Sequence, residues 1–393
     1  MLHRALLLVA ALVALPAEDA IKIVSSLPRT GSAGAQTGTI VNGIVLAIEQ
    51  AGGAITLDGK SYKISYADWD DASPERGQWD AAVESANAAK AVADPDILAY
   101  IGTFNSGAAK ISIPVLNKAG LAMISPANTA IGLTKPSGEP GEPDIYRPSG
   151  KVTYFRVVPA DDIQGLAAAR WAKALNTTKV FVLHDREAYG KGVADSFKRN
   201  AATLGLTVVG YEAIDIKAAN YRPLVTKIRA AGAQLVYFGG TTQTNGGQLV
   251  KDLVSGGVDA KFLCPDGCFE NAFITAAGAA NCEGRVLVTF GGVPPKQLTG
   301  KGATFVAAYR ERFKAEPEAY AVYGYECGNV VLDALRRANQ KDRAAVVAAL
   351  AATKDFDGAL GRWSFDANGD TSLTTMSGSM VKNGEWAFDR VLE

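Results

Sequence analysis

Two short loops of small and hydroxylic residues contain the groups in this sequence that are best suited to hold an anion. The first loop is Asn105-Ser106-Gly107, and the second runs from Ser125 to Thr129. Each loop follows an apolar strand pattern and opens a helix, so it places backbone N–H groups and hydroxyls where the helix dipole favours negative charge. No general base, nucleophile or metal-binding cluster accompanies these loops. We therefore expect a pocket that holds a carboxylate without reacting with it.

Alternating strand and helix patterns position these loops. Apolar runs at Ile21–Ser26 and Ile97–Ile101 predict buried strands, whereas Thr39–Ala51 has apolar residues at helical spacing. We also expect a strand at 62–68 and a long helix from Pro74 to about Ala93. Continuous apolar strands separated by helices are typical of parallel sheets that are covered on both faces.

The alternation stops and then begins again. The segment 132–153 is rich in proline and glycine and predicts a surface loop. Strands and helices alternate again from Tyr154 to Thr289, and helices and a hairpin at Met376–Asp389 follow, with Asn383-Gly384 as its turn. We therefore predict an α/β protein with two doubly wound parallel-sheet lobes, which would bind a ligand in the cleft between them.

The bulk composition and the first residues exclude several classes of protein. The 393 residues contain 40 Lys+Arg and 40 Asp+Glu, so the chain lacks the charge excess typical of nucleic-acid binding. A basic start, the apolar run Ala5–Leu15 and Pro16-Ala17 before two acids predict a signal peptide within 1–20, cleaved after Ala17. We accordingly expect a periplasmic or other extracytoplasmic location.

Three of the four cysteines lie close together in the sequence. Cys264, Cys268 and Cys282 fall within nineteen residues, and an exported protein favours a disulfide among them. The sequence does not choose the pair, although Cys268–Cys282 is slightly favoured. A zinc site is disfavoured because no histidine lies near, so we expect no metal. Cys327 lies in an apolar helical pattern and predicts a buried thiol.

Short segments spread along the chain resemble the type I periplasmic solute-binding proteins, and within them the branched-chain amino-acid (Leu/Ile/Val) binding family. The matching segments are Pro28-Arg29-Thr30-Gly31 with Gln36-Thr37-Gly38, Tyr66-Ala67-Asp68 with Asp70-Asp71, Ile101-Gly102 with Ser106, Ile124-Ser125-Pro126 with Thr129, Phe155-Arg156 with Asp161 and Gln164-Gly165, His184-Asp185 with Tyr189-Gly190-Lys191-Gly192, and Gly239-Gly240. Their order and spacing together make the resemblance specific.

The resemblance implies two lobes joined by a three-strand hinge. Lobe 1 would hold 21–158 and 291–368, and lobe 2 would hold 159–290 and 369–393. The lobes would close on an α-amino acid, branched-chain or bulkier, and the closed form would dock on an ABC transporter permease. We expect a monomer without enzymatic activity, cofactor or nucleic-acid partner.

The resemblance also implies roles for individual residues. Ser106, Ala127 and Thr129 would hold the ligand carboxylate, Asp266 and Asp161 would pair with its ammonium, and Tyr189 would close over its backbone. Local alternatives remain open at each position: an ordinary N-cap for Ser106, a helix-capping turn for 127–129, a Pro-Asp-Gly turn for Asp266, a solvated hinge acid for Asp161, and a packed ring for Tyr189.

Threonines replace aromatic rings that relatives often carry at two places, Thr37 in the first loop and Thr241 after Gly239-Gly240. This difference implies a roomier or more polar pocket. Tyr320, Tyr323 and Tyr325 form an aromatic stripe at helical spacing, which we interpret as core.

Two other functions remain alternatives. A family member that binds an aromatic or aliphatic carboxylate, or a small amide such as urea, becomes the better interpretation if Asp266 does not face the cleft. A nucleotide-binding enzyme is disfavoured because the chain has neither GxGxxG after its first strand nor GxxxxGKS/T. His184-Asp185 suggests a catalytic triad, but no serine elbow accompanies the pair, so His184 is interpreted as structural.

Overall fold

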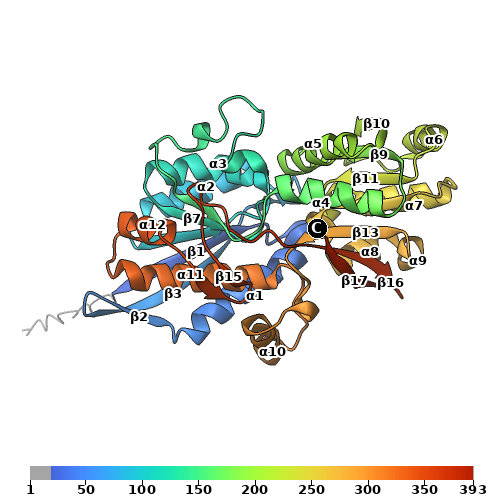
Figure 1. The fold of residues 1–393 in the computed structure, drawn as a ribbon. Coiled ribbons are helices and arrows are strands. Elements are labelled where there is room, and N and C mark those ends of the chain that lie inside the picture. Colours follow the sequence, from blue (N-terminus) through green and yellow to red (C-terminus); the bar gives the residue numbers. More distant parts are fainter. Residues whose placement is uncertain (1–18, 393) are drawn as a thin grey trace, which may run out of the picture.

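Two β-sheets, one in each lobe, organise the chain in the computed structural model, which describes residues 19–392 (Figure 1). The predicted signal peptide lies outside these described residues. We refer to the lobe around the six-stranded sheet as the first lobe and to the lobe around the seven-stranded sheet as the second lobe. The two lobes lie side by side, with the first on the left in Figure 1.

The sheet of the first lobe has the strand order β2-β3-β1-β6-β7-β8 and is parallel except for the β2–β3 hairpin. Its strands are β1 (Ala20–Leu27), β2 (Ala54–Leu57), β3 (Lys60–Asp70), β6 (Ile97–Gly102), β7 (Ala122–Ser125) and β8 (Tyr154–Arg156). The helices of this lobe are α1 (Gly34–Gln50), α2 (Ala81–Ala93) and α3 (Ser106–Lys118), joined by α10 (Lys301–Phe313), α11 (Ala321–Ala338) and α12 (Arg343–Ala351) from much later in the chain. Helix α11 packs along α1, which ties the C-terminal region to the first lobe.

The sheet of the second lobe has the order β10-β9-β11-β12-β13-β16-β17, and it is parallel except at β16, which pairs antiparallel with both β13 and β17. Its strands are β9 (Lys179–His184), β10 (Thr207–Ala213), β11 (Leu235–Gly239), β12 (Lys261–Cys264), β13 (Val286–Gly291), β16 (Met376–Lys382) and β17 (Glu385–Leu392). Its helices are α4 (Asp161–Ala174), α5 (Ala188–Thr203), α6 (Arg222–Ala230), α7 (Gly246–Ser255), α8 (Asn271–Ala277) and α9 (Ala279–Cys282). The predicted α/β class with two parallel-sheet lobes is confirmed.

The predicted C-terminal hairpin is also confirmed. Strands β16 and β17 pair antiparallel from Met376 to Leu392. Asn383 and Gly384 both adopt positive φ angles, 54° and 75°. A two-residue turn that joins twisted strands needs this backbone conformation, and asparagine followed by glycine adopts it at little cost.

One predicted helix begins in the wrong place. Helix α2 starts at Ala81 and not at Pro74, because the residues before it form a small hairpin of β4 (Ala72–Ser73) and β5 (Gln78–Trp79). Asp80 caps the helix, since its carboxylate accepts N–H bonds from Ala82 at 2.8 Å and Val83 at 3.3 Å. The hairpins β2–β3 and β14–β15 (Phe356–Gly358 and Gly361–Trp363) were not predicted either.

The four cysteines are all free and buried, so the prediction of a disulfide is wrong in this structure. Cys264 ends β12 and donates to the carbonyl of Leu287 at 3.4 Å, whereas Cys268 donates to the carbonyl of Gly240 at 3.5 Å. Closeness in sequence was a poor guide because a disulfide requires a narrow range of backbone separation and side-chain direction. The prediction of a buried thiol at Cys327 is confirmed.

A buried ion pair joins two of the segments that connect the lobes. Arg156, at the end of β8, is fully buried, and its Nε donates to Asp370 Oδ1 at 2.7 Å. Asp370 lies between β15 and β16, where the chain returns to the second lobe. The guanidinium also donates to the carbonyl of Ala130 at 2.8 Å and to the hydroxyl of Thr134. The first and last connections are therefore held together by one residue.

We expect the protein to lose stability as the pH rises from about 5 to about 8, because several buried acids keep their protons in the native state. Burial raises the pKa of Glu84, Asp185 and Glu326 to about 7, whereas such groups ionise at about 4 in an unfolded chain. Between these values the native state binds more protons than the unfolded state, so the free energy of unfolding falls as the pH rises.

Urea unfolding at several pH values measures this slope. Glu326→Gln should flatten it by an amount that corresponds to about 3 kcal/mol at most, because the variant lacks one acid whose pKa burial raises. The glutamine oxygen can still accept a bond from Trp363 Nε1 or Ala359 N–H, which lie at 2.6 and 2.8 Å from the carboxylate. Glu49→Gln is the control, since Glu49 is paired with Arg312 at the surface and its pKa is lowered. Equal slopes for the two variants would contradict a raised pKa of Glu326 in the native state.

Candidate functional site

A small cavity lies between the two lobes, where loops from the carboxyl ends of both sheets meet. It is lined by Phe104, Asn105, Ala127, Tyr189, Thr241, Asp266, Gly267 and Tyr320. The first three residues follow β6 and β7 in the first lobe, and the next four lie after β9, β11 and β12 in the second. The cavity has a volume of about 20 Å³, which is room for about one water molecule. An organic ligand can therefore enter only when the lobes part.

Asp266 is the central charged group of the cavity. It is 2% exposed, and its Oδ1 accepts the Tyr189 hydroxyl at 2.6 Å. Its Oδ2 accepts the hydroxyl of Tyr320, which precedes α11 and belongs to the first lobe. This bond joins the two lobes directly. Burial raises the pKa of Asp266 above its ordinary value, and the two phenol hydrogen bonds only partly offset the rise.

A second acid, Asp161, lies close enough for its charge to act on Asp266. Asp161 begins α4, is fully buried, and has no hydrogen bond to either carboxylate oxygen among the described residues. Burial and then the charge of Asp266 raise its pKa well above the ordinary value. Its backbone N–H donates to the carbonyl of Thr129 at 2.9 Å, and the buried Thr129 hydroxyl also has no partner within residues 19–392. Two neighbouring buried acids favour a positively charged ligand group.

The hydroxylic loops face this acidic side from the first lobe. Ser106 starts α3 and is 2% exposed, and its Oγ accepts the Ala130 N–H at 3.4 Å. The Ser106 hydroxyl proton itself has no acceptor in the described part of the chain. The backbone N–H of Ala127 donates to Ser125 Oγ at 3.1 Å, so the second loop is folded around Ser125. The start of α3 therefore carries the donors that remain available to an anion.

The structure brings most of the predicted site residues together. Ala127, Tyr189, Thr241 and Asp266 line the cavity, and Ser106, Thr129 and Asp161 are buried in the segments that form it. Thr37 does not line the cavity. The hydroxyl of Thr37 donates to the carbonyl of Pro28 at 2.6 Å and accepts from Arg29 at 3.0 Å, so it secures the loop before α1.

Tyr320 lines the cavity, although its sequence pattern was interpreted as core. Tyr320 and Tyr323 are both 1% exposed and belong to the hydrophobic core, as the stripe predicts, and Tyr320 lines the cavity in addition. Tyr320 differs because it stands just before the first residue of α11, at the end of a connection. Tyr189 and Ser106 also stand at the beginning of helices, and that shared position is the signal that could have identified Tyr320. Phe104, Asn105 and Gly267 were missed as well.

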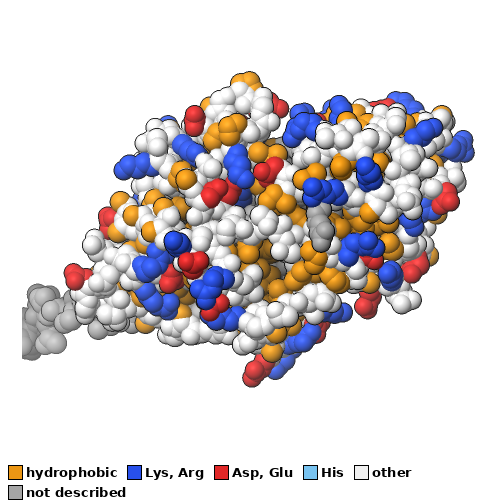
Figure 2. Space-filling view, viewed as in Figure 1, with side chains coloured by type: hydrophobic (Ala, Val, Ile, Leu, Met, Phe, Trp, Pro, Cys, Tyr) orange, Lys and Arg blue, Asp and Glu red, His pale blue; other side chains and the backbone are white. Residues whose placement is uncertain are grey.

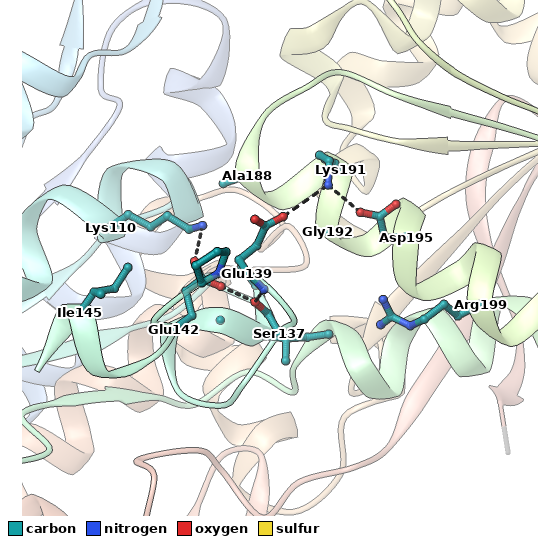
Figure 3. A pocket seen from close by; sticks show the side chains of 14 residues that line it. Lys110, Ser137, Glu139, Glu142, Ile145, Ala188, Lys191, Gly192, Asp195 and Arg199 are labelled. Carbon is teal, nitrogen blue, oxygen red and sulfur yellow. Dashed lines mark hydrogen bonds and ion pairs between the residues drawn. The ribbon is translucent and has the colours of Figure 1, made fainter.

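A larger groove of about 340 Å³ lies on the boundary between the loop 130–145 and α5 (Figure 3). Glu139 of the loop reaches Lys191 of α5 at 3.6 Å, and Lys191 also pairs with Asp195 at 2.9 Å. A second pair across the boundary joins Arg76 to Glu187 at 3.6 Å. Solvent-exposed pairs of this kind contribute at most about 1 kcal/mol each, so they adjust the closed arrangement without determining it.

On the face shown in Figure 2, Lys and Arg side chains are interspersed with Asp and Glu. No three His, Cys, Asp or Glu side chains of the described residues are placed to hold a metal ion together. Within the same range, none of the helices combines the length and apolar character that a membrane crossing requires.

Comparison with known proteins gives a consistent family. The sequence model of the periplasmic binding protein family matches residues 20–385. A Leu/Ile/Val-binding protein homolog from Brucella abortus (strain 2308) is 31% identical over 348 residues, which cover 88% of this chain and 86% of the relative. Among solved structures, a leucine-binding protein from Thermotoga maritima has a TM-score of 0.83 at 25% identity, covering 95% of this chain and 99% of that one. A branched-chain amino-acid transporter substrate-binding protein from Streptococcus pneumoniae, in complex with isoleucine, has a TM-score of 0.81 at 25% identity with the same coverage.

Proposed function

The chain belongs to the periplasmic binding protein family, and we propose that it captures a free α-amino acid, branched-chain or otherwise apolar, between its lobes for an ABC importer. One observation carries the choice of ligand: the buried carboxylate of Asp266 faces the cavity between the lobes. Donors alone would accept any small acid. A negative charge placed opposite those donors selects a ligand that is also positively charged. The names of the relatives, which bind leucine, isoleucine or valine, support the same ligand class.

The two ends of a zwitterion would meet opposite sides of the cavity. The ligand carboxylate would accept the Ser106 hydroxyl and the N–H groups at the start of α3. Aligned neutral donors can hold an anion without a formal counter-charge. The ligand ammonium would donate to Asp266 and to the unpartnered oxygens of Asp161. Without such partners, burying either charge would cost several kcal/mol.

Ligand binding and lobe closure would be one process. The carboxylate donors belong to the first lobe and Asp266 belongs to the second, so only the closed arrangement satisfies both ends of the ligand. A ligand that contacts both lobes in this way shifts the population toward the closed state. The hydrogen bond from Tyr320 to Asp266 also contributes to closure, because it connects the two lobes at the point where the ligand ammonium would bind.

We infer the remaining features of the function from the family and from the groups in the cavity. The protein would act outside the cytoplasm as a monomer, present its closed form to the permease, and catalyse no reaction. His184, the residue that most resembles a catalytic base, accepts the Arg186 N–H at 3.1 Å and lies against the ring of Tyr211 at 5.1 Å. Burial also lowers its pKa, which fits a neutral structural imidazole.

Calorimetric titration of the purified protein with single compounds tests the proposal. We expect an apolar amino acid such as leucine, isoleucine, valine or phenylalanine to bind; a dissociation constant of about 1 μM corresponds to about −8 kcal/mol. Leucine and 4-methylpentanoate form the decisive pair, because the second compound lacks only the amine. Binding of benzoate, 4-methylpentanoate or urea without binding of any amino acid would contradict the proposed ligand class.

Ser106→Ala should weaken amino-acid binding about 10-fold, because a hydrogen bond to a charged group contributes about 1.5–3 kcal/mol. Calorimetry measures the change. Ser112→Ala is the matched control, since Ser112 lies on the same helix and its hydroxyl donates to the carbonyl of Ala108 at 3.3 Å, inside α3. The same affinity for wild type and Ser106→Ala would place the carboxylate elsewhere.

A further inference from the structure

Two glutamates at the boundary between the lobes, outside the amino-acid cavity, contain oxygen atoms that lack donors. Glu270 is 2% exposed; its Oε1 accepts Gln243 Nε2 at 2.9 Å, whereas its Oε2 is buried and has no hydrogen-bond partner in the described chain. Glu318 accepts Asn271 Nδ2 at 3.4 Å through Oε1, and its Oε2 is likewise buried and unpartnered. Each buried acceptor without a donor costs free energy.

Two further oxygens next to Glu270 share this property. Gln243 Oε1 and Thr242 Oγ1 are buried and have no partner among residues 19–392. Both residues belong to the short helix η4 (Thr242–Thr244), and Gln243 bonds directly to Glu270. The Thr242 hydroxyl can supply one proton to this group. The buried oxygens Glu270 Oε2, Glu318 Oε2 and Gln243 Oε1 still outnumber that donor. A further donor group would satisfy them, and a positively charged one would also balance the charge of the two acids.

The two acids come from different lobes. Glu270 follows β12 in the second lobe. Glu318 precedes α11, and its N–H donates to Thr39 Oγ1 of α1 at 3.2 Å, which attaches it to the first lobe. Burial raises the pKa of Glu270 to about 7, and the negative charge of Glu318 adds to the rise. Closing the lobes therefore brings two carboxylates toward each other. Their repulsion opposes closure unless a cation or a proton lies between them.

A groove of about 600 Å³ passes over both acids. The apolar part of its wall is formed by Phe269, Ile274, Pro294, Pro295 and Trp386. The polar part contains the two acids together with Asn271, Thr275, Lys296, Glu316 and Glu385. The ring of Trp386 packs edge-on against Phe269 at 5.4 Å, and its Nε1 donates to the carbonyl of Glu270 at 3.0 Å. Apolar walls beside buried acids suit an ammonium group on a carbon chain better than a hydrated metal ion, which prefers oxygen ligands on all sides.

Aromatic rings separate this groove from the amino-acid cavity. Tyr320 lines the cavity and packs edge-on against Phe290 at 5.6 Å, and Phe290 packs edge-on against Phe269 of the groove at 5.3 Å. The two spaces are therefore neighbours with a shared wall. They hold different acids, Asp266 on one side and Glu270 with Glu318 on the other.

We propose that the groove between the lobes binds an alkylammonium group, held by Glu270 and Glu318, with its carbon chain along Trp386 and the two prolines. The bound cation contacts both lobes and so favours the closed arrangement. By linkage, a group that stabilises closure raises the affinity for the amino acid, and the amino acid raises the affinity for the group by the same factor. The site goes beyond the proposed function, because it recognises an ammonium group that an apolar amino acid in the cavity does not supply. The ammonium belongs either to a separate amine or to the side chain of a basic amino acid whose backbone lies in the cavity.

Calorimetric titration of the purified protein with 1,5-diaminopentane, with and without saturating leucine, tests the proposal. We expect saturable binding that becomes at least about 5-fold tighter with leucine. Glu270→Gln should weaken diamine binding at least about 10-fold, because the variant loses a charge-assisted bond. Glu75→Gln is the control, since Glu75 is exposed and lies outside the groove, and the affinity of this variant for the diamine should stay within about 2-fold of wild type. Glu318→Gln repeats the test from the first lobe, should Glu270→Gln fail to fold.

Other outcomes would decide against the site or identify the source of the ammonium. Absence of saturable diamine binding, or equal affinity in wild type and both Gln variants, would overturn the proposal. Tighter binding of Ca²⁺ than of the diamine, with the same dependence on Glu270, would overturn the chemical class. Titration with L-lysine identifies the source of the ammonium. If one lysine binds per protein, competes with both leucine and the diamine and requires Glu270, the ammonium belongs to the side chain of a basic amino acid. If leucine and the diamine bind at the same time, it belongs to a separate amine. Leucine binding is measured in the same titrations, so failure of the proposed function can be distinguished from failure of the alkylammonium site.

Discussion

Asp266→Asn should lower the affinity for the amino acid by about 10²- to 10³-fold. Removing one partner of a buried, hydrogen-bonded charge pair costs about 2–5 kcal/mol, and the ligand ammonium would be left in the cavity without its main counter-charge. One of the two hydroxyls of Tyr189 and Tyr320 can still donate to the asparagine oxygen, and the other can accept from its NH2 group, so the cavity keeps its shape while it loses charge. Titration calorimetry with leucine at neutral pH measures the loss.

Two controls accompany Asp266→Asn: a ligand that lacks the amine, and a substitution far from the cavity. The amine-free analogue 4-methylpentanoate should bind Asp266→Asn at least as well as it binds wild type, because the repelling charge has been removed. Asp259→Asn, an exposed change in the same lobe, should leave leucine binding within about 2-fold. Equal losses for leucine and its amine-free analogue would exclude an ammonium role for Asp266.

The pairing of the ligand ammonium with Asp266 and Asp161 also predicts how the affinity for the amino acid changes with pH. The pKa values of Asp266 and Asp161 are both raised by burial, so these acids take up protons more readily than exposed ones as the pH falls. An ammonium needs at least one of them ionised. Amino-acid affinity should therefore decrease as the pH falls through the raised pKa of the pair, and ligand binding should release protons in this range.

Arg156→Met should lower the free energy of unfolding by about 3 kcal/mol, because it removes the fully buried partner of the Asp370 carboxylate and leaves that carboxylate with the half-buried Lys135, at 3.0 Å from Oδ2. Arg156 also donates to the carbonyl of Ala130 and the hydroxyl of Thr134, and those acceptors would lose their donors. Methionine keeps most of the side-chain volume, so charge and hydrogen bonding are the main changes. Urea unfolding followed by circular dichroism measures the change.

Two comparisons isolate the ion pair. Arg310→Met removes an exposed pair with Glu316, at 2.7 Å, and should cost about 1 kcal/mol or less. Asp370→Asn combined with Arg156→Met should be more stable than Arg156→Met alone, because the second change removes the carboxylate that has lost its buried guanidinium partner; the double-mutant cycle gives the coupling. Identical losses for Arg156→Met and Arg310→Met would show that the buried pair does not hold the connection.

The aromatic part of the cavity wall affects which ligand side chains the cavity can accept. Phe104 and Tyr320 pack edge-on at 5.6 Å and form an aromatic surface in the cavity. Thr241 lines the cavity at a position where relatives often carry a ring, whereas Thr37 is turned to the loop before α1. The proposed widening of the pocket therefore rests on Thr241. An apolar ligand side chain would pack against the two rings and toward that threonine.

The sequence by itself determined the class of fold and the places where binding groups would gather. Alternating apolar strands and helices specify parallel sheets, and parallel sheets place their following loops at one edge. The two hydroxylic loops after β6 and β7, the acid after β12 and the Asn-Gly hairpin turn could all be placed from the sequence because each depends on residues that are neighbours in the chain. The individual roles in the site came from the resemblance, since they depend on both lobes.

Only the tertiary structure decided which distant residues meet. The start of α2 depended on a small hairpin and on capping by Asp80, which outweigh the helical start suggested by Pro74. Tyr320 contacts Asp266, 54 residues away, and Arg156 pairs with Asp370, 214 residues away. The meeting of Glu270 and Glu318 likewise depends on how the lobes close. Local periodicity reports which face of a strand or helix is buried, whereas contacts across lobes depend on packing that no short segment of sequence encodes.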